Sequence, residues 1–242
     1  MNLAFLWTQF LLGAQSFARQ HELYRLPGGS IALNGGRNAN CHWCLNVKSV
    51  TRSVTSPIRA IDNFLPPAEH AAVWALLRDG AWNFGAFSAA GGHRYFYKHF
   101  AGFREGEQEY QEPRLIEEEL RRYPVLAAVW ARLRAGPFNG HVLARCYANG
   151  MPPGAEGGLH MDSNVQSHLT AIYYPHPTWD ADLAGETLFY NSARDEVIAA
   201  VYPKPNRMVV FPGTIPHVAR PISVRAGDMR VTLMFKTAGM DL

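Results

Sequence analysis

The fold is predicted to form around one stretch, GGLHMDSN at residues 157–164. Side chains at positions i and i+2 of an extended strand point to the same face, so His160 and Asp162 are expected to share one face. A second histidine, His217, follows later in the sequence FPGTIPHV at residues 211–218. The three side chains are therefore candidates to converge on one small ligand.

These residue types indicate a metal site. Two imidazoles and one carboxylate on one face of a metal ion leave three coordination positions open, an arrangement typical of non-haem Fe(II) oxygenases. The pattern H-x-D alone is a weak signal, because both residues are common. Its surroundings strengthen it, since the chain from Arg145 to Lys236 reads as short strands separated by turns.

The order of the predicted elements indicates a mainly β fold. Helical spacing of apolar residues occurs in three early segments, at residues 68–78, 112–122 and 124–134. Short strands are predicted before them at residues 60–65, and after them at residues 142–147, 168–174, 186–190, 197–201, 208–211, 218–222 and 230–236. Helices followed by evenly spaced strands predict a two-sheet, cupin-like jelly roll with helices that buttress one sheet.

Length and composition suit one globular domain. The chain has 242 residues, of which 48% are hydrophobic, and a formal net charge of +3. We expect a single domain at residues 54–242, with a helical buttress at 66–135 and a jelly-roll core at 140–237.

The sequence contains no run of basic residues, so nucleic acid binding is not predicted. Three cysteines make no disulfide framework, which favours a reducing, cytoplasmic setting, and the domain is expected to be a monomer or a homodimer.

The first 53 residues differ from the rest. The apolar stretch at residues 1–14 is too short and broken to span a bilayer, and no positive charge precedes it, as a signal peptide would require. Residues 27–40 are rich in Gly and Asn and are expected to be loop or disordered. Cys41 and Cys44 form a lone C-x2-C without a second ligand pair. We interpret residues 1–53 as a leader or a poorly ordered extension.

Residues 145–236 resemble the double-stranded β-helix core of the 2-oxoglutarate/Fe(II)-dependent oxygenase superfamily, nearest its prolyl-hydroxylase-like branch. The segments that carry this resemblance are ordered along the chain with similar spacing. They are RCY at 145–147, HMD at 160–162, TAIYY at 170–174, WD at 179–180, GETL at 185–188, FP at 211–212, His217, and RVT at 230–232.

The resemblance implies a role for each site residue. His160, Asp162 and His217 would hold Fe(II), and 2-oxoglutarate would bind as co-substrate, with ascorbate as an optional reductant. The far carboxylate of 2-oxoglutarate would meet Arg230, whose fork suits a carboxylate. The other predicted cofactor-binding residues are Tyr174, Tyr147 and Thr232.

Three arginines after His217 compete for the carboxylate. Arg220 lies too close to His217 to reach the depth of a barrel, and Arg225 adjoins a predicted hairpin turn. Arg230 opens the last strand, where residues 230, 232 and 234 share a face. We therefore predict Arg230 as the carboxylate ligand, although a different register of the last hairpin would select one of the others.

The resemblance implies a hydroxylase that acts on a small molecule or an amino-acid-like unit and releases succinate and CO2. Two alternatives stay open from the sequence. A relative in the same family could use this chemistry for desaturation, cyclisation or epimerisation. A non-catalytic, cupin-like barrel would bind a metal without consuming 2-oxoglutarate. Neither a membrane nor a nucleic acid is expected as a partner.

Removing residues 1–53 should leave a folded and active protein, because their loop-like composition predicts few buried contacts. Circular dichroism and turnover of the truncated chain test this. An insoluble or inactive product would show that the domain boundary at residue 54 is wrong.

Overall fold

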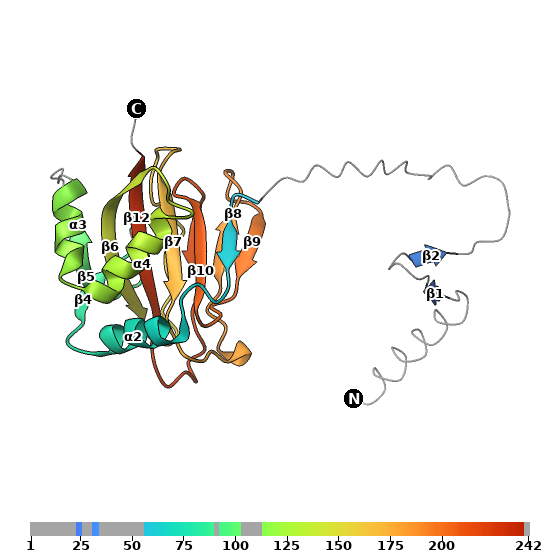
Figure 1. Ribbon diagram of the computed structural model, residues 1–242. Coiled ribbons are helices and arrows are strands. Elements are labelled where there is room, and N and C mark those ends of the chain that lie inside the picture. Colours follow the sequence, from blue (N-terminus) through green and yellow to red (C-terminus); the bar gives the residue numbers. More distant parts are fainter. Residues whose placement is uncertain (1–22, 26–30, 34–55, 90–91, 103–112, 240–242) are drawn as a thin grey trace. The chain divides into compact units, whose positions relative to one another are not determined.

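The computed structural model describes residues 23–25, 31–33, 56–89, 92–102 and 113–239. The chain divides into two units, Met1–Ser53 and Val54–Leu242, which are described separately. In the first unit, β1 (Leu23–Arg25) pairs antiparallel with β2 (Ile31–Leu33) (Figure 1). The loop prediction is therefore wrong for β2. Cys41 and Cys44 lie outside the described residues, and the leader interpretation stays a prediction.

The second unit is built on a seven-stranded sheet. Its strand order is β3 (Arg59–Ile61), β10 (Arg207–Pro212), β7 (Leu169–Tyr174), β12 (Arg230–Gly239), β6 (His141–Met151), β5 (Tyr95–Gly102) and β4 (Asn83–Ala86). All neighbours pair antiparallel. The last strand of the chain, β12, thus lies in the middle, between β6 and β7.

A smaller sheet closes the jelly roll. It contains β11 (His217–Ala219), β8 (Thr187–Tyr190) and β9 (Val197–Val201), in that order. A short 3-10 helix, Ala181–Leu183, precedes β8. Phe189 and Val201 of this sheet pack in one buried cluster with Ile172, Val209 and Phe211 of the large sheet. The inner faces of the two sheets therefore meet, and the predicted jelly-roll fold is confirmed.

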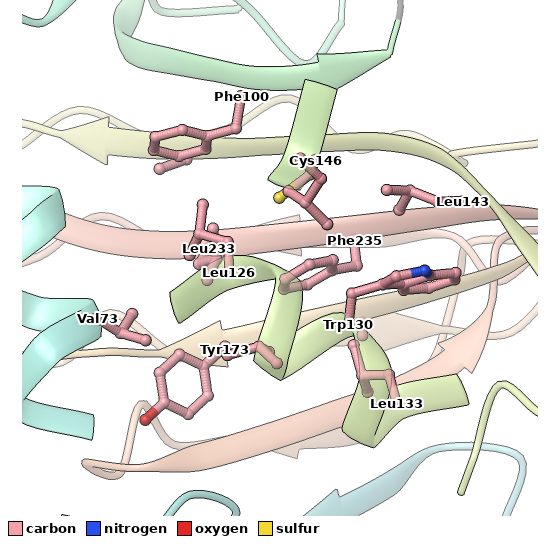
Figure 2. Close-up of a cluster of buried hydrophobic side chains, with 14 of the residues drawn as sticks. Val73, Phe100, Leu126, Trp130, Leu133, Leu143, Cys146, Tyr173, Leu233 and Phe235 are labelled. Atoms are coloured by element: carbon pink, nitrogen blue, oxygen red, sulfur yellow. The ribbon is translucent and has the colours of Figure 1, made fainter. Parts of the chain in front are cut away.

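Three helices buttress the other face of the large sheet (Figure 1). They are α2 (Pro67–Arg78), α3 (Pro113–Arg121) and α4 (Pro124–Arg134). Each begins with proline, whose missing N–H costs nothing in the first turn. Apolar residues at helical spacing on α4 are buried, and Figure 2 shows Leu126, Trp130 and Leu133 beside Leu233 and Phe235 of β12. The Trp130 and Phe235 rings stack with centroids 6.3 Å apart.

Alternation along β12 divides its side chains between two environments. Leu233 and Phe235 belong to the cluster under the helices. Their neighbours Thr232 and Met234 line a cavity between the sheets instead. Because successive side chains of a strand point to opposite faces, β12 contributes residues both to the hydrophobic core and to the cavity.

Several sequence predictions need correction. His160 lies in an isolated bridge to His217 rather than in a strand, and Asp162 lies in the following loop, so no single rigid strand carries both. The strand β4 was missed. Strand β6 continues to Met151, beyond its predicted end at residue 147, and β11 ends at Ala219, before its predicted end at residue 222. In the part of the chain that the structure describes, no helix is long and apolar enough to cross a bilayer.

Replacing Leu126 by Ala should lower the free energy of unfolding by about 2–5 kcal/mol, because the side chain is 0% exposed between α4 and the sheet. Leu115→Ala on α3 is the control, since Leu115 is 54% exposed, and it should cost less than about 0.5 kcal/mol. Urea denaturation measures both. Equal costs would mean that α4 does not contribute to the core as described.

Candidate metal and co-substrate site

His160, Asp162 and His217 converge at one end of the cavity. One potential ligand atom from each lies within 4.8 Å of the other two. The Nε2 atom of His160 is 3.3 Å from Asp162 Oδ1, and the Nε2 atom of His217 is 3.6 Å from Asp162 Oδ2. The isolated bridge between the two histidines brings them together across the sheets, with mutual backbone bonds of 3.1 and 2.9 Å.

Both imidazole rings are held by backbone carbonyls. The Nδ1 atom of His160 is 2.8 Å from the carbonyl oxygen of Gly158, and that of His217 is 2.9 Å from the carbonyl oxygen of Ile215. A carbonyl only accepts, so each Nδ1 carries a proton and Nε2 is the ring atom of each histidine that can bind a metal ion. Burial lowers the pKa of His217 to about 4, which leaves its ring neutral at pH 7. This donor set fits a divalent metal ion.

The Asp162 carboxylate is held by two neighbouring strands. Thr170 Oγ1 on β7 donates to Asp162 Oδ2 at 2.7 Å, and Lys236 Nζ on β12 lies 2.8 Å from Asp162 Oδ1. The carboxylate side chain is 2% exposed. Burial by itself raises the pKa of Asp162, but the Lys236 ammonium, together with His217 and His160, holds that pKa well below the usual range. Asp162 is therefore an anion in the interior.

A second cluster of polar groups surrounds the Arg230 side chain, and Arg230 is 2% exposed. Its Nε donates to the carbonyl oxygen of Gly185 at 2.8 Å, and its Nη2 donates to Thr187 Oγ1 at 3.0 Å. Gly185 has φ +86, and a Cβ there would lie 2.7 Å from Ile222 Cγ2, so the turn requires glycine. A guanidinium has five N–H donors, and two of the Arg230 donors are used in this way.

The cluster of candidate metal ligands and the cluster around Arg230 share one cavity of about 200 Å³. Of the predicted cofactor-binding residues, Arg230, Tyr147 and Thr232 line it with the three candidate metal ligands. Tyr174 does not line it. The Tyr174 hydroxyl is 2.8 Å from Thr187 Oγ1 instead, and the Arg230 guanidinium lies 5.5 Å from the centre of its ring. Tyr174 is therefore placed to support Thr187 and Arg230 from behind.

The sequence analysis assigned no site role to several cavity residues, among them Lys236, Arg145 and Thr187. Alternation from Arg230 along β12 reaches Lys236, so the signal for that residue was present. Arg145 lies directly opposite Lys236 in the register of β6 and β12. Thr187 follows Gly185 and Glu186 in a segment that the family resemblance had already marked.

The competing arginines lie elsewhere. Arg220 is 3.8 Å from Glu156, with about half of each side chain exposed, and Arg225 is an exposed residue. Neither lines the cavity. Tyr95 and Tyr97 of β5 and Met151 of β6 contribute further walls of the cavity.

Comparisons with known proteins agree with this geometry. Residues 144–235 match the family described as the 2OG-Fe(II) oxygenase superfamily. No curated protein matches the chain. A prolyl-4-hydroxylase of Pseudomonas putida is 20% identical and covers 76% of this chain and 94% of its own, with a TM-score of 0.52.

Two further solved structures share the fold. A 2OG-Fe(II) oxygenase family oxidoreductase of Burkholderia pseudomallei is 17% identical over 75% of this chain and 85% of its own, with a TM-score of 0.56. The non-heme alpha-ketoglutarate-dependent epimerase SnoN from nogalamycin biosynthesis is 13% identical over 76% of this chain and 78% of its own, with a TM-score of 0.51. Identities this low show a common fold.

The ion pair between Lys236 and Asp162 should be strongly coupled in metal-free protein. Lys236→Met and Asp162→Asn should each lower the free energy of unfolding, and the double variant should cost about 1–3 kcal/mol less than their sum. Urea denaturation with a chelator present measures all four proteins.

The exposed pair Lys204 and Asp62, 2.8 Å apart, is the control cycle. Its coupling should stay below about 1 kcal/mol, as for solvent-exposed ion pairs. If the losses in free energy of unfolding caused by Lys236→Met and Asp162→Asn were additive, the ion pair would be contradicted.

Proposed function

Residues 144–235 belong to the 2OG-Fe(II) oxygenase superfamily, which makes the chain an Fe(II)- and 2-oxoglutarate-dependent dioxygenase, and from this premise we propose that it hydroxylates a small molecule or an amino-acid-like unit. The observation that carries the proposal is the convergence of His160, Asp162 and His217 on the same cavity as buried Arg230. A metal site and a carboxylate site in one small cavity are what this co-substrate requires.

In this proposal, the two imidazole Nε2 atoms and the Asp162 carboxylate hold Fe(II). Their orientation supports the role, because each Nδ1 is engaged by a backbone carbonyl and Asp162 is fixed by Thr170 and Lys236. Three protein ligands leave positions for a co-substrate and O2.

Arg230 binds the far carboxylate of 2-oxoglutarate through its remaining N–H donors. Its bonds to Gly185 and Thr187 fix the guanidinium, so little freedom is lost when a carboxylate binds. Burial raises the pKa of Tyr147, which keeps its hydroxyl protonated and able to donate inside the cavity. Thr232 supplies a further hydroxyl on the same face of β12.

When bound, Fe(II) and 2-oxoglutarate supply an oxidant made from O2, with release of succinate and CO2. The chain orients the reacting groups and limits the access of water. Ile172 and Met234 add apolar side chains to the lining of the cavity. The fold also occurs in an epimerase, so product analysis has to distinguish hydroxylation from the other outcomes.

Purified protein with Fe(II), O2 and 2-oxoglutarate should form succinate, and a substrate should increase both O2 uptake and succinate. His217→Ala should abolish this turnover and lower iron content without loss of the β circular dichroism signal, because the triad has no spare ligand. Metal binding without succinate formation would favour the non-catalytic barrel. A His217→Ala protein with full iron and normal turnover would rule out the proposed triad.

Arg230→Ala should weaken 2-oxoglutarate binding roughly 30- to several-thousand-fold, equivalent to about 2–5 kcal/mol for truncating a buried charge partner. Arg225→Ala removes the same charge at an exposed position and should change the affinity less than about fivefold. Titration of 2-oxoglutarate with saturating Fe(II) under argon measures both. A large loss for Arg225→Ala alone would reverse the assignment.

A further inference from the structure

One cation in the cavity has no role in the proposed chemistry. Arg145 lies on β6, opposite Lys236 on β12 and Gly102 on β5. It lines the cavity together with His160, Asp162 and His217. Lys236, in the same row across the sheet, is already paired with Asp162. Arg145 is thus at the metal end of the cavity, on the same row as the residue that anchors the carboxylate.

The guanidinium of Arg145 has no carboxylate partner among the described residues. Its Cζ lies 4.2 Å from the centre of the Tyr147 ring, which holds the group in place. Its Nε atom is buried and makes no hydrogen bond to any residue that the structure describes. Buried N–H groups are normally satisfied, and leaving one unpaired costs free energy. The described residues therefore leave this group available to an acceptor that they do not supply.

The charges around the cavity lead to the same conclusion. The charged residues that line it are three permanent cations, Arg145, Arg230 and Lys236, and one carboxylate, Asp162, which gives a net +2 from 3 − 1. Fe(II) and the 2-oxoglutarate dianion cancel each other. The surplus of positive charge remains after both have bound, so the cavity attracts an anionic third component.

We propose that Arg145 is a substrate-binding residue that pairs with an oxyanion group of the substrate, a carboxylate or a phosphate. The fork of N–H donors suits either group, and its fixed position on Tyr147 sets the distance between that group and the triad. Asn149 and Tyr97, which face each other on β6 and β5, line the cavity and can bind further polar atoms of the substrate. The inference rests on the proposed function for the position of 2-oxoglutarate.

The test uses the full chain with Fe(II) and saturating 2-oxoglutarate under argon, so that turnover does not occur. Acetate, inorganic phosphate and neutral acetamide are titrated at constant ionic strength, and the thermal unfolding midpoint is recorded. The proteins are wild type, Arg145→Gln, Arg145→Lys and the exposed control Arg225→Gln. Circular dichroism establishes that each variant is folded, and the lysine variant replaces Arg145→Gln if glutamine disrupts the sheet.

Acetate or phosphate should stabilise wild type and Arg225→Gln, whereas acetamide should not. Arg145→Gln should raise the dissociation constant of the stabilising anion at least about tenfold, with Arg145→Lys between the two. The anion that stabilises more strongly identifies the carboxylate or the phosphate class. Equal anion responses in wild type and Arg145→Gln would overturn the proposal, as would a lack of response in wild type.

A second measurement separates this proposal from the proposed function. The affinity of Arg145→Gln for 2-oxoglutarate should stay within about threefold of wild type, and its substrate-independent succinate formation should persist. A tenfold loss of 2-oxoglutarate affinity would assign Arg145 to the co-substrate and overturn the inference. Absence of succinate from wild type would instead contradict the proposed function, while the anion titration would still test Arg145.

Discussion

The buried ion pair between Lys236 and Asp162 is the interaction on which the site depends. An ionised carboxylate in a largely apolar interior is costly unless a charge and hydrogen bonds compensate it. Lys236 supplies the charge at 2.8 Å and Thr170 supplies a hydrogen bond at 2.7 Å. Because these partners come from β12 and β7, the central pairing of the large sheet fixes where the carboxylate lies. The single β-bridge between His160 and His217 then places both imidazole rings next to this carboxylate.

One strand serves both ends of the cavity. Arg230 and Lys236 lie six residues apart on β12, about 20 Å along an extended strand, and both face inward. The Arg230 side chain contacts Gly185 and Thr187, whereas the Lys236 side chain contacts Asp162. The outward residues of the same strand, Leu233 and Phe235, pack under the helices. The core that holds β12 therefore also holds the site, which explains why the chain buttresses this sheet with three helices.

The fold and the candidate triad could be predicted because their signals are local or repeated. Helix α4 has its predicted bounds, since proline begins it and a glycine follows it closely. Alternation also placed Arg230 and Thr232 on one face. The side chains that bind Asp162 could not be predicted from the sequence, because only the register between strands shows that Lys236 lies next to the loop after His160. Tyr174 faces Thr187 for a similar reason, since hydroxyl orientation depends on neighbours distant in the sequence.

The isolated bridge between His160 and His217 was also unpredictable. A strand was expected at His160 because side chains two residues apart would share a face, but the glycines before it and the loop after it allow only one bridge. Long-range pairing, rather than local strand propensity, aligns the two rings. Strand β4 is similar, because its short sequence NFGA carries a glycine and becomes a strand only through pairing with β5.

The central claim is that one cavity holds Fe(II) at the triad and 2-oxoglutarate at Arg230. A crystal structure of the anaerobic complex, with anomalous data collected at the iron edge, tests both parts at once. We expect an iron peak bonded to the Nε2 atoms of His160 and His217 and to Asp162, with 2-oxoglutarate chelating the metal and its far carboxylate on Arg230. Iron bound elsewhere, or 2-oxoglutarate density away from Arg230, would contradict the account.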